Sequence, residues 1–311
     1  MFSLVRIISC VSAGKTSVLL RLSAQVAENQ KIAGREVSPG RVIYLAGENP
    51  DDIRMRWMAM AQRMPFDPDK INVHFIPGRF TLSTMFDRVA DEVRDLGGAV
   101  LLIFDTAAVY FEGEDDNSNA QMGEYARTLR RFTTLAGGPC VIVACHPTKN
   151  ATDDRLLPRG GGAFLNEMDG NLVCWQTDGL VQVHWHEKHR GADFSPIPFK
   201  LHTVTASGLV DSKGRPIPTV LAEALSEKAQ EAAEAETRSD EDAVLVLLLH
   251  GGGSSNSKMA EALGWFMRDG KAYKEKVRRV SERLKKSKLV TDDRNGACLT
   301  EKGKKEAAKC A

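Results

Sequence analysis

The spacing of hydrophobic positions changes repeatedly along the first two-thirds of the chain. Short apolar runs, typical of buried strands, alternate with segments whose apolar residues recur every three or four positions, which is typical of amphipathic helices. The predicted strands are 4–9, 41–46, 71–76, 99–104 and 140–145, and the predicted helices are 16–28, 50–63, 83–96 and 119–135. This alternation predicts an α/β fold with a parallel-rich sheet. Two later runs, 172–175 and 180–185, predict an antiparallel pair.

The last third of the chain has a different pattern. Residues 223–242 are rich in Ala and Glu and lack a clear apolar stripe, which predicts an exposed helix or a linker. Helical patterns then precede a predicted hairpin at 290–299, around Asn295-Gly296, and a closing helix follows it. Helix, helix, helix, hairpin is the order of elements in a winged helix. We therefore predict an α/β domain at 1–205, a linker at 206–240 and a winged-helix domain at 241–311.

Composition excludes several classes of protein. Of the 311 residues, 42% are hydrophobic and 27% are charged, which is ordinary for a soluble globular protein. No apolar run reaches about 18 residues, so we expect no membrane span. The six Cys are scattered without a Cys-x-x-Cys pair. This argues against a zinc site or a disulfide scaffold and predicts a reducing, cytoplasmic location.

The overall charge of +1 hides an asymmetry between the two ends of the chain. From Lys258 to the end there are 16 Lys and Arg against 8 Asp and Glu, whereas the rest of the chain has 26 against 33. A basic C-terminal segment on an acidic body predicts that this segment contacts an anionic polymer such as DNA.

Residues 9–16 read Ser-Cys-Val-Ser-Ala-Gly-Lys-Thr, between a predicted strand and a predicted helix. This matches the phosphate-binding P-loop, Gly-x-x-x-x-Gly-Lys-Ser/Thr, except that Ser9 replaces the first Gly. Lys15 would neutralise phosphate oxygens and Thr16 would ligate Mg²⁺, which predicts ATP and Mg²⁺ as ligands. The predicted nucleotide-binding residues are Ser9, Cys10, Val11, Ser12, Ala13, Gly14, Lys15, Thr16 and Ser17. The alternative is a plain strand–turn–helix junction. Ser9 is tolerable at negative φ but costs about 1 kcal/mol at positive φ.

Three polar residues follow predicted strands at the end where a parallel sheet would place the phosphates. Asp105 follows the most apolar strand, where a Walker B carboxylate holds Mg²⁺; its alternative role is a helix or turn cap. Glu48 is a candidate general base, or else an acid of the turn before Pro50. His146 is a candidate sensor of the γ-phosphate, or else a structural histidine.

Together these motifs resemble the RepA-type hexameric RecA-like ATPases, plasmid and phage replicative helicases related to the DnaB helicases. Five elements match in order across about residues 4–201: the P-loop, Glu48, Asp105-Thr106, His146 and Lys188-His-Arg190-Gly. The resemblance implies Glu48 as catalytic base and His146 as γ-phosphate sensor. It also implies Lys188 and Arg190 as fingers that act in a neighbouring subunit of a homo-hexamer. The alternative for the last pair is a solvated basic strand end.

Two departures from the family bear on nucleotide affinity rather than on fold. Ser9 replaces a Gly, and only eight residues precede it, whereas relatives have a further strand and an adenine-side segment there. We expect that the chain is truncated or mis-started, or else that it holds the base differently.

The predicted DNA contacts lie in two places. The glycine-containing segment with Arg155 and Arg159 resembles the loop that faces the central channel of such rings, the alternative being a mobile surface loop. In the basic module, Tyr273, Val277, Val280 and Leu284 would form a buried stripe of the long helix. The outward candidates for DNA contact are then Lys274, Arg278, Lys285 and Lys286, with Arg294 at the hairpin tip. The alternative is a winged helix that docks a protein.

The sequence thus predicts an ATP-dependent DNA motor of the plasmid or phage replicative helicase type, a homo-hexamer that acts on DNA and not on membranes. Two alternatives remain open. One is a DNA-binding regulator with a degenerate nucleotide site, motivated by Ser9 and by the missing N-terminal segment. The other is a RecA-like ATPase that remodels DNA–protein complexes without unwinding.

Overall fold

The computed structural model describes residues 3–9, 14–147, 161–177, 180–190, 194–252, 255–267, 269–293 and 296–310. The chain divides into two compact units, Met1–Ser226 and Glu227–Ala311. We describe each unit by itself.

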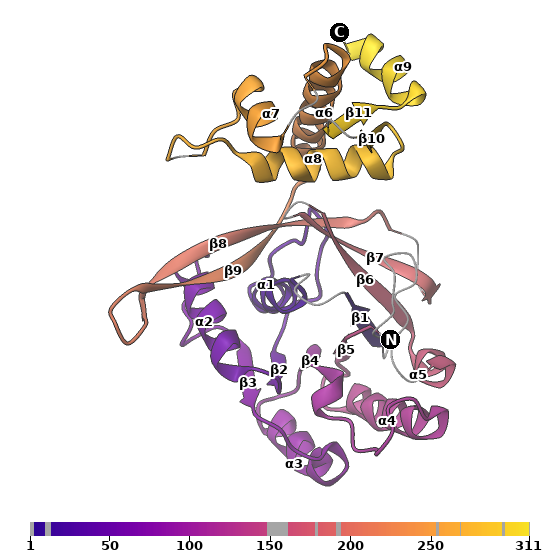
Figure 1. The fold of residues 1–311 in the computed structure, drawn as a ribbon. Coiled ribbons are helices and arrows are strands. Elements are labelled where there is room, and N and C mark those ends of the chain that lie inside the picture. Colours follow the sequence, from indigo (N-terminus) through magenta and orange to yellow (C-terminus); the bar gives the residue numbers. More distant parts are fainter. Residues whose placement is uncertain are drawn as a thin grey trace. The chain divides into compact units, whose positions relative to one another are not determined.

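Unit 1 is built on a nine-stranded sheet of order β3-β2-β4-β5-β1-β6-β7-β8-β9, counted over the described residues (Figure 1). Its strands are β1 (Leu4–Ile8), β2 (Val42–Ala46), β3 (Val73–Pro77), β4 (Leu101–Asp105), β5 (Cys140–Cys145), β6 (Gly170–Thr177), β7 (Leu180–His189), β8 (Ile197–Val210) and β9 (Pro216–Ala224). The pairs from β3 to β6 are parallel, and those from β6 to β9 are antiparallel. This confirms the predicted α/β class and its parallel-rich sheet.

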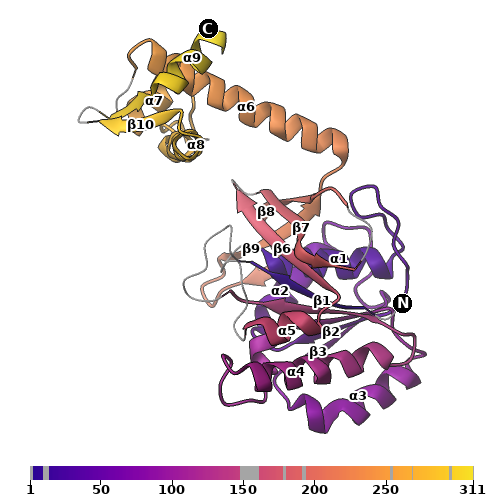
Figure 2. The same ribbon diagram turned by 90° about the vertical axis from the view of Figure 1, so that its right-hand side faces the viewer.

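Helices cover both faces of the parallel part of the sheet (Figures 1 and 2). They are α1 (Lys15–Ala27), α2 (Pro50–Ala61), α3 (Leu82–Asp95), α4 (Asn119–Arg131) and α5 (Gly161–Glu167), with short 3₁₀ turns at Ala107–Val109 and Phe132–Thr134. Successive strand residues alternate between two apolar clusters: Tyr44 packs on the α1–α2 side, whereas Ile43 and Leu45 pack on the α3–α4 side. Burial on both faces explains why these strands read as continuous apolar runs.

The antiparallel end of the sheet extends further than the sequence indicated. The predicted pair 172–175 and 180–185 is present as β6 and β7, but β8 and β9 add a long hairpin over 197–224. The predicted linker 206–240 is therefore divided between two elements. Its residues up to Ala224 belong to the β8–β9 hairpin, and its residues from Glu227 on lie in α6 (Glu227–Leu249). The sequence signal was weak because many β8 side chains are exposed or half-exposed.

In its described residues, unit 2 contains three helices, a two-stranded antiparallel sheet and a closing helix. After α6 come α7 (Asn256–Ala262), α8 (Lys274–Lys286), β10 (Val290–Asp293), β11 (Gly296–Leu299) and α9 (Glu301–Cys310). Val277, Val280 and Leu284 of α8 are buried in its core, and Tyr273 is half-buried. In the described ranges of both units, no helix is long and apolar enough to cross a membrane.

Candidate nucleotide-binding site

The predicted site residues gather at one edge of the sheet because they follow parallel strands. Ala46 of β2 pairs with Asp105 of β4, and Ile8 of β1 pairs with Cys145 of β5. The carboxyl ends of these four strands therefore meet at the same edge, where ligands bind in open α/β sheets. Helix α1 begins there with Lys15.

Lys15 is buried against the residue that breaks the P-loop pattern. Its ammonium donates to the Ser9 hydroxyl at 2.9 Å and lies 3.2 Å from the Ser9 carbonyl oxygen. Burial lowers the pKa of Lys15, and nearby groups that include Asp105 and Glu48 offset part of that effect. The described non-glycine residues with positive φ do not include Ser9. Serine at this position therefore carries no left-handed backbone strain and gives Lys15 a hydrogen-bond partner.

Asp105 accepts two hydrogen bonds on a single oxygen. The Thr16 hydroxyl donates to its Oδ2 at 2.9 Å, and the Tyr44 hydroxyl donates to the same atom at 2.7 Å. Burial raises the pKa of Asp105 above its ordinary value, while these two hydrogen bonds act in the opposite direction. In the part of the chain that the structure describes, both of these hydrogen bonds go to Oδ2 and none is recorded to Oδ1.

Glu48 and His146 face each other across the same edge. His146 Nε2 lies 3.4 Å from Glu48 Oε2, and both side chains are partly exposed. The backbone N–H groups of Gly47 and Glu48 donate to the Asp105 carbonyl oxygen, which fixes the turn after β2 beside β4. The pair thus lies next to the Thr16–Asp105 contact with open access to solvent.

Ser17 has a different environment from Lys15 and Thr16. Its hydroxyl donates to the Val220 carbonyl oxygen of β9 at 2.9 Å and accepts from Arg56 at 2.7 Å. Arg56 also donates to Val220 O and pairs with Asp52. These bonds tie α1 to α2 and to the hairpin, so in this structure the Ser17 hydroxyl is engaged by protein groups.

Arg190 is held within its own chain. Its guanidinium lies 2.9 Å from Asp169 Oδ1, although the Arg190 side chain is largely exposed. Asp169 also accepts from Arg130 and from the Leu4 backbone N–H. Burial alone would raise the pKa of Asp169, but the hydrogen bonds from Arg130 and Leu4 and the two arginine charges together lower it.

The predicted basic residues of α8 fall into two groups. Lys274 and Lys286 are exposed. Arg278 pairs with Glu275 at 2.6 Å, and Lys285 pairs with Asp292 of β10 at 2.7 Å. Lys274 and Lys286 are therefore the better placed of the four to meet an external anion.

Several predicted site residues lie outside the described part of the chain. These are Cys10, Val11, Ser12, Ala13, Arg155, Arg159 and Arg294, together with the side chain of Lys188.

Part of the chain matches a known protein family, and the fold resembles a solved structure. Residues 6–152 match the family model described as an AAA domain. The match includes Lys15, Thr16, Glu48, Asp105 and His146, and it supports an ATPase domain in this region. No curated protein matches the chain. Among solved structures, the chain is similar to the "ATPase Domain of G40P", with 12% sequence identity, a TM-score of 0.47, and coverage of 64% of this chain and 81% of that one.

Three residues that the sequence did not predict form hydrogen bonds with predicted site residues. Tyr44 donates to Asp105, Arg56 donates to Ser17, and Asp169 accepts from Arg190. A signal for Tyr44 was present: a tyrosine inside a buried strand needs a partner for its hydroxyl, and the adjacent strand ends in a carboxylate. Arg56 and Asp169 gave no comparable signal, because both act across distant parts of the chain.

Proposed function

We propose that this chain is an ATP-hydrolysing motor that acts on DNA, in the manner of plasmid and phage replicative helicases. The observation that carries the proposal is the convergence of Lys15, Thr16, Asp105, Glu48 and His146 at one sheet edge, at the start of α1.

The residues at this edge fit Mg-ATP by their own chemistry. Gly14 has a φ of 82°, a conformation that favours glycine and lets the chain turn into α1. The N-terminus of that helix favours anions. Lys15 is buried with Ser9 as its hydrogen-bond partner, and the buried Thr106 hydroxyl at the same edge has no partner among the described residues. We assign Lys15 to the phosphates, and Thr16 and Asp105 to the metal.

Bound Mg-ATP supplies the phosphoanhydride bond and the cation that neutralises its charge. The chain supplies the remaining functions. Glu48 is exposed and ionisable, and we assign it the role of accepting a proton from the attacking water. His146, 3.4 Å from Glu48, would orient that carboxylate and contact the terminal phosphate.

We further propose that Lys188 and Arg190 act in the site of a neighbouring subunit of a homo-hexamer. In the single chain Arg190 pairs with Asp169, so acting in trans requires it to exchange this carboxylate for a phosphate. The Arg190 side chain is largely exposed, and Asp169 keeps its hydrogen bonds from Arg130 and Leu4 if Arg190 leaves, so the exchange does not leave the carboxylate without a partner.

The DNA-binding role of unit 2 rests on charge and element order. Its three helices, hairpin and closing helix have the order of a winged helix, and α8 carries exposed Lys274 and Lys286. The excess of basic residues after Lys258 supports contact with phosphates. We also keep Arg155, Arg159 and Arg294 as proposed DNA contacts.

The central experiment is ATP hydrolysis with and without single-stranded DNA. Lys15→Ala should abolish DNA-stimulated turnover, while the exposed hairpin variant Lys213→Ala serves as the matched control. Unchanged turnover in Lys15→Ala would refute the site assignment. A forked-duplex unwinding assay then separates a helicase from an ATPase that only remodels DNA–protein complexes.

The subunit and DNA assignments have their own tests. Arg190→Ala should retain ATP binding but lose hydrolysis, and mixing it with Lys15→Ala subunits should restore part of the activity. A protein that stays monomeric with ATP and DNA contradicts the trans role. The double variant Lys274→Ala/Lys286→Ala should weaken DNA binding and lower its salt dependence relative to Lys305→Ala on α9.

The alternative, a regulator with a degenerate nucleotide site, draws less support from Ser9 than the sequence alone gives it. Ser9 is buried without positive φ and contacts Lys15, so it costs the loop no backbone strain. A nucleotide titration distinguishes the two functions, because the regulator predicts no binding.

A further inference from the structure

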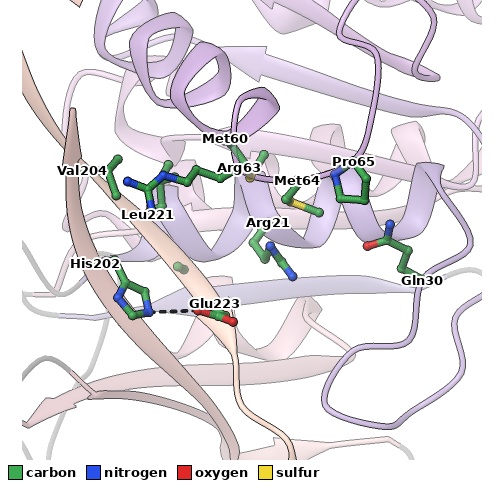
Figure 3. Close-up of a pocket in the computed structure, with 11 residues that line it drawn as sticks. Arg21, Gln30, Met60, Arg63, Met64, Pro65, His202, Val204, Leu221 and Glu223 are labelled. Atoms are coloured by element: carbon green, nitrogen blue, oxygen red, sulfur yellow. Dashed lines mark ion pairs between the residues drawn. The ribbon is translucent and has the colours of Figure 1, made fainter. Parts of the chain in front are cut away.

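A cavity of about 360 Å³ lies between α1, the C-terminal end of α2 and the β8–β9 hairpin (Figure 3). Arg21 of α1, Arg63 just after α2, and His202 and Glu223 of the hairpin contribute charged or polar groups to its walls. Met60, Met64 and Leu221 contribute apolar surface. None of these residues belongs to the nucleotide site described above.

Arg21 and Arg63 have no hydrogen-bond or ion-pair partner in the described part of the chain. Within the described residues, neither side chain makes a hydrogen bond or an ion pair, and Arg21 Nε is buried without an acceptor. A buried donor without a partner costs free energy, so such an atom is normally satisfied by protein, water or ligand. Burial also lowers the pKa of Arg21, an effect that the charge of Glu223 partly offsets.

The one carboxylate in the cavity wall already has a partner. Glu223 Oε2 lies 3.0 Å from His202 Nε2, on the neighbouring strand of the hairpin (Figure 3). Glu223 therefore balances at most one of the two arginine charges. The side chains of Arg21, Arg63 and Glu223 give the cavity wall a net charge of +1 when His202 is neutral. The net charge is +2 when His202 is protonated, so the cavity favours an anion in both cases.

The remaining wall favours an apolar body attached to that anion. Met60 and Met64 are buried side chains of the α2 end, and Leu221 is buried on β9. Methionine is a soft, adaptable surface that packs against flat and irregular groups. The walls are also held in place, because the Gln62 amide exchanges two hydrogen bonds with the backbone of Ser207 on β8.

We propose that this cavity binds a small organic phosphate, with the phosphate between Arg21 and Arg63 and an apolar group against Met60 and Met64. Two guanidinium groups from different elements suit a tetrahedral anion, whose oxygens accept hydrogen bonds from several directions. A cavity of this size holds a small molecule rather than a polymer.

This site is separate from the P-loop. Arg21 is six residues beyond Lys15, which is about 9 Å along α1. The hydrogen bonds that join Ser17, Arg56 and Val220 lie between the two places along α1. A ligand in the cavity would contact α1, α2 and the hairpin at once, so it would tie the P-loop helix to the antiparallel end of the sheet. The proposal does not depend on the proposed function.

The test is calorimetric titration of phenyl phosphate into the full chain carrying Lys15→Ala, which removes the main phosphate ligand of the P-loop. Phenyl phosphate should bind more tightly than inorganic phosphate, and phenol should not bind. Arg21→Gln and Arg63→Gln should each weaken binding by about tenfold or more, since each removes a charge-assisted contact. Arg54→Gln, an exposed arginine of α2 outside the cavity, is the matched control and should bind as its parent does.

Two results would overturn the proposal. One is binding that is absent at millimolar phenyl phosphate, or that is unaffected by both arginine substitutions. The other is displacement by ATP of the phenyl phosphate binding that depends on Arg21 and Arg63, because the cavity would then belong to the nucleotide site. Arg63 is exposed, so Arg63→Gln keeps the test valid if Arg21→Gln fails to fold.

Discussion

The hydrogen bond from Tyr44 to Asp105 predicts a measurable, pH-dependent loss of stability in Tyr44→Phe. The tyrosine is fully buried, and its hydroxyl donates to a carboxylate oxygen at 2.7 Å. Hydrogen bonds to charged groups contribute about 1.5–3 kcal/mol, so we expect Tyr44→Phe to lower the free energy of unfolding of unit 1 by about 2 kcal/mol. Burial already raises the pKa of Asp105, so losing this bond leaves an unfavourable buried charge less compensated.

The chain offers a matched control for this substitution. Tyr125 is also buried, and its hydroxyl donates at 2.8 Å to the neutral carbonyl oxygen of Ala107. Tyr125→Phe should therefore cost about 1 kcal/mol, the usual contribution of a neutral hydrogen bond. In an Asp105→Asn background, the loss of free energy of unfolding caused by Tyr44→Phe should also fall to about 1 kcal/mol, because the acceptor of the Tyr44 hydroxyl is then neutral.

The pH dependence has a definite sign. The Tyr44 hydrogen bond favours ionised Asp105, so removing it raises the pKa of Asp105 in the folded state further above the ordinary 3.8. The part of the stability loss that depends on ionised Asp105 is therefore complete at a pH above the folded-state pKa of Asp105 in Tyr44→Phe. It shrinks as the pH falls through that pKa. The loss in Tyr125→Phe should not change over the same range.

The assay is urea unfolding in a Trp265→Phe background. The fluorescence then reports Trp57, Trp175 and Trp185, which all lie in unit 1. Equal, pH-independent losses in Tyr44→Phe and Tyr125→Phe would refute the reasoning, because the acceptor at Asp105 would then behave as a neutral group.

Three further substitutions test other parts of the structure. Gly14→Ala should destabilise unit 1 by about 1 kcal/mol in urea unfolding, because its φ of 82° disfavours a side chain; a neutral effect would contradict that backbone. Asp169→Asn should lower the free energy of unfolding of unit 1 by about 1 kcal/mol at pH 7. The lowered pKa of Asp169 means that this difference disappears as the pH falls below the ordinary 3.8, and a constant difference would contradict the ion pairs. Gly303→Ala should destabilise unit 2 by about 2 kcal/mol, because its new methyl group would meet the Leu289 carbonyl oxygen, while the ATP affinity of unit 1 serves as the control.

The sequence predicted the parallel half of unit 1 because that half has strong, local signals. Strands such as Leu101–Asp105 are buried on both faces and read as unbroken apolar runs. The site residues at their ends follow from topology alone, since parallel strands present their carboxyl ends at one edge. The structure therefore brings Glu48 and His146 together although they are 98 residues apart in the sequence.

The antiparallel end could not be predicted in the same way. In Ile197–Val210 the only buried residues are Pro198, Phe199, Val204 and Ala206, so neither spacing pattern dominates. The hairpin is stabilised by contacts with α1 and α2, such as the bonds of Ser17 and Gln62 to its backbone. Contacts of this kind depend on tertiary structure and leave little trace in local spacing.

Ser9 illustrates how the structure changes the meaning of a sequence departure. From sequence alone, the loss of the first P-loop glycine weakens the case for a nucleotide site. In the structure the serine hydroxyl accepts a hydrogen bond from Lys15 at 2.9 Å, while the backbone at Ser9 has no positive φ. A buried ammonium needs a partner in the absence of ligand, and a glycine offers only its carbonyl oxygen. Ser9 thus stabilises the ligand-free form of Lys15, and binding of an anion at the P-loop would have to exchange that hydrogen bond for one to phosphate. Under the proposed function, Ser9 would therefore lower the nucleotide affinity modestly, because Lys15 has to give up this hydrogen bond.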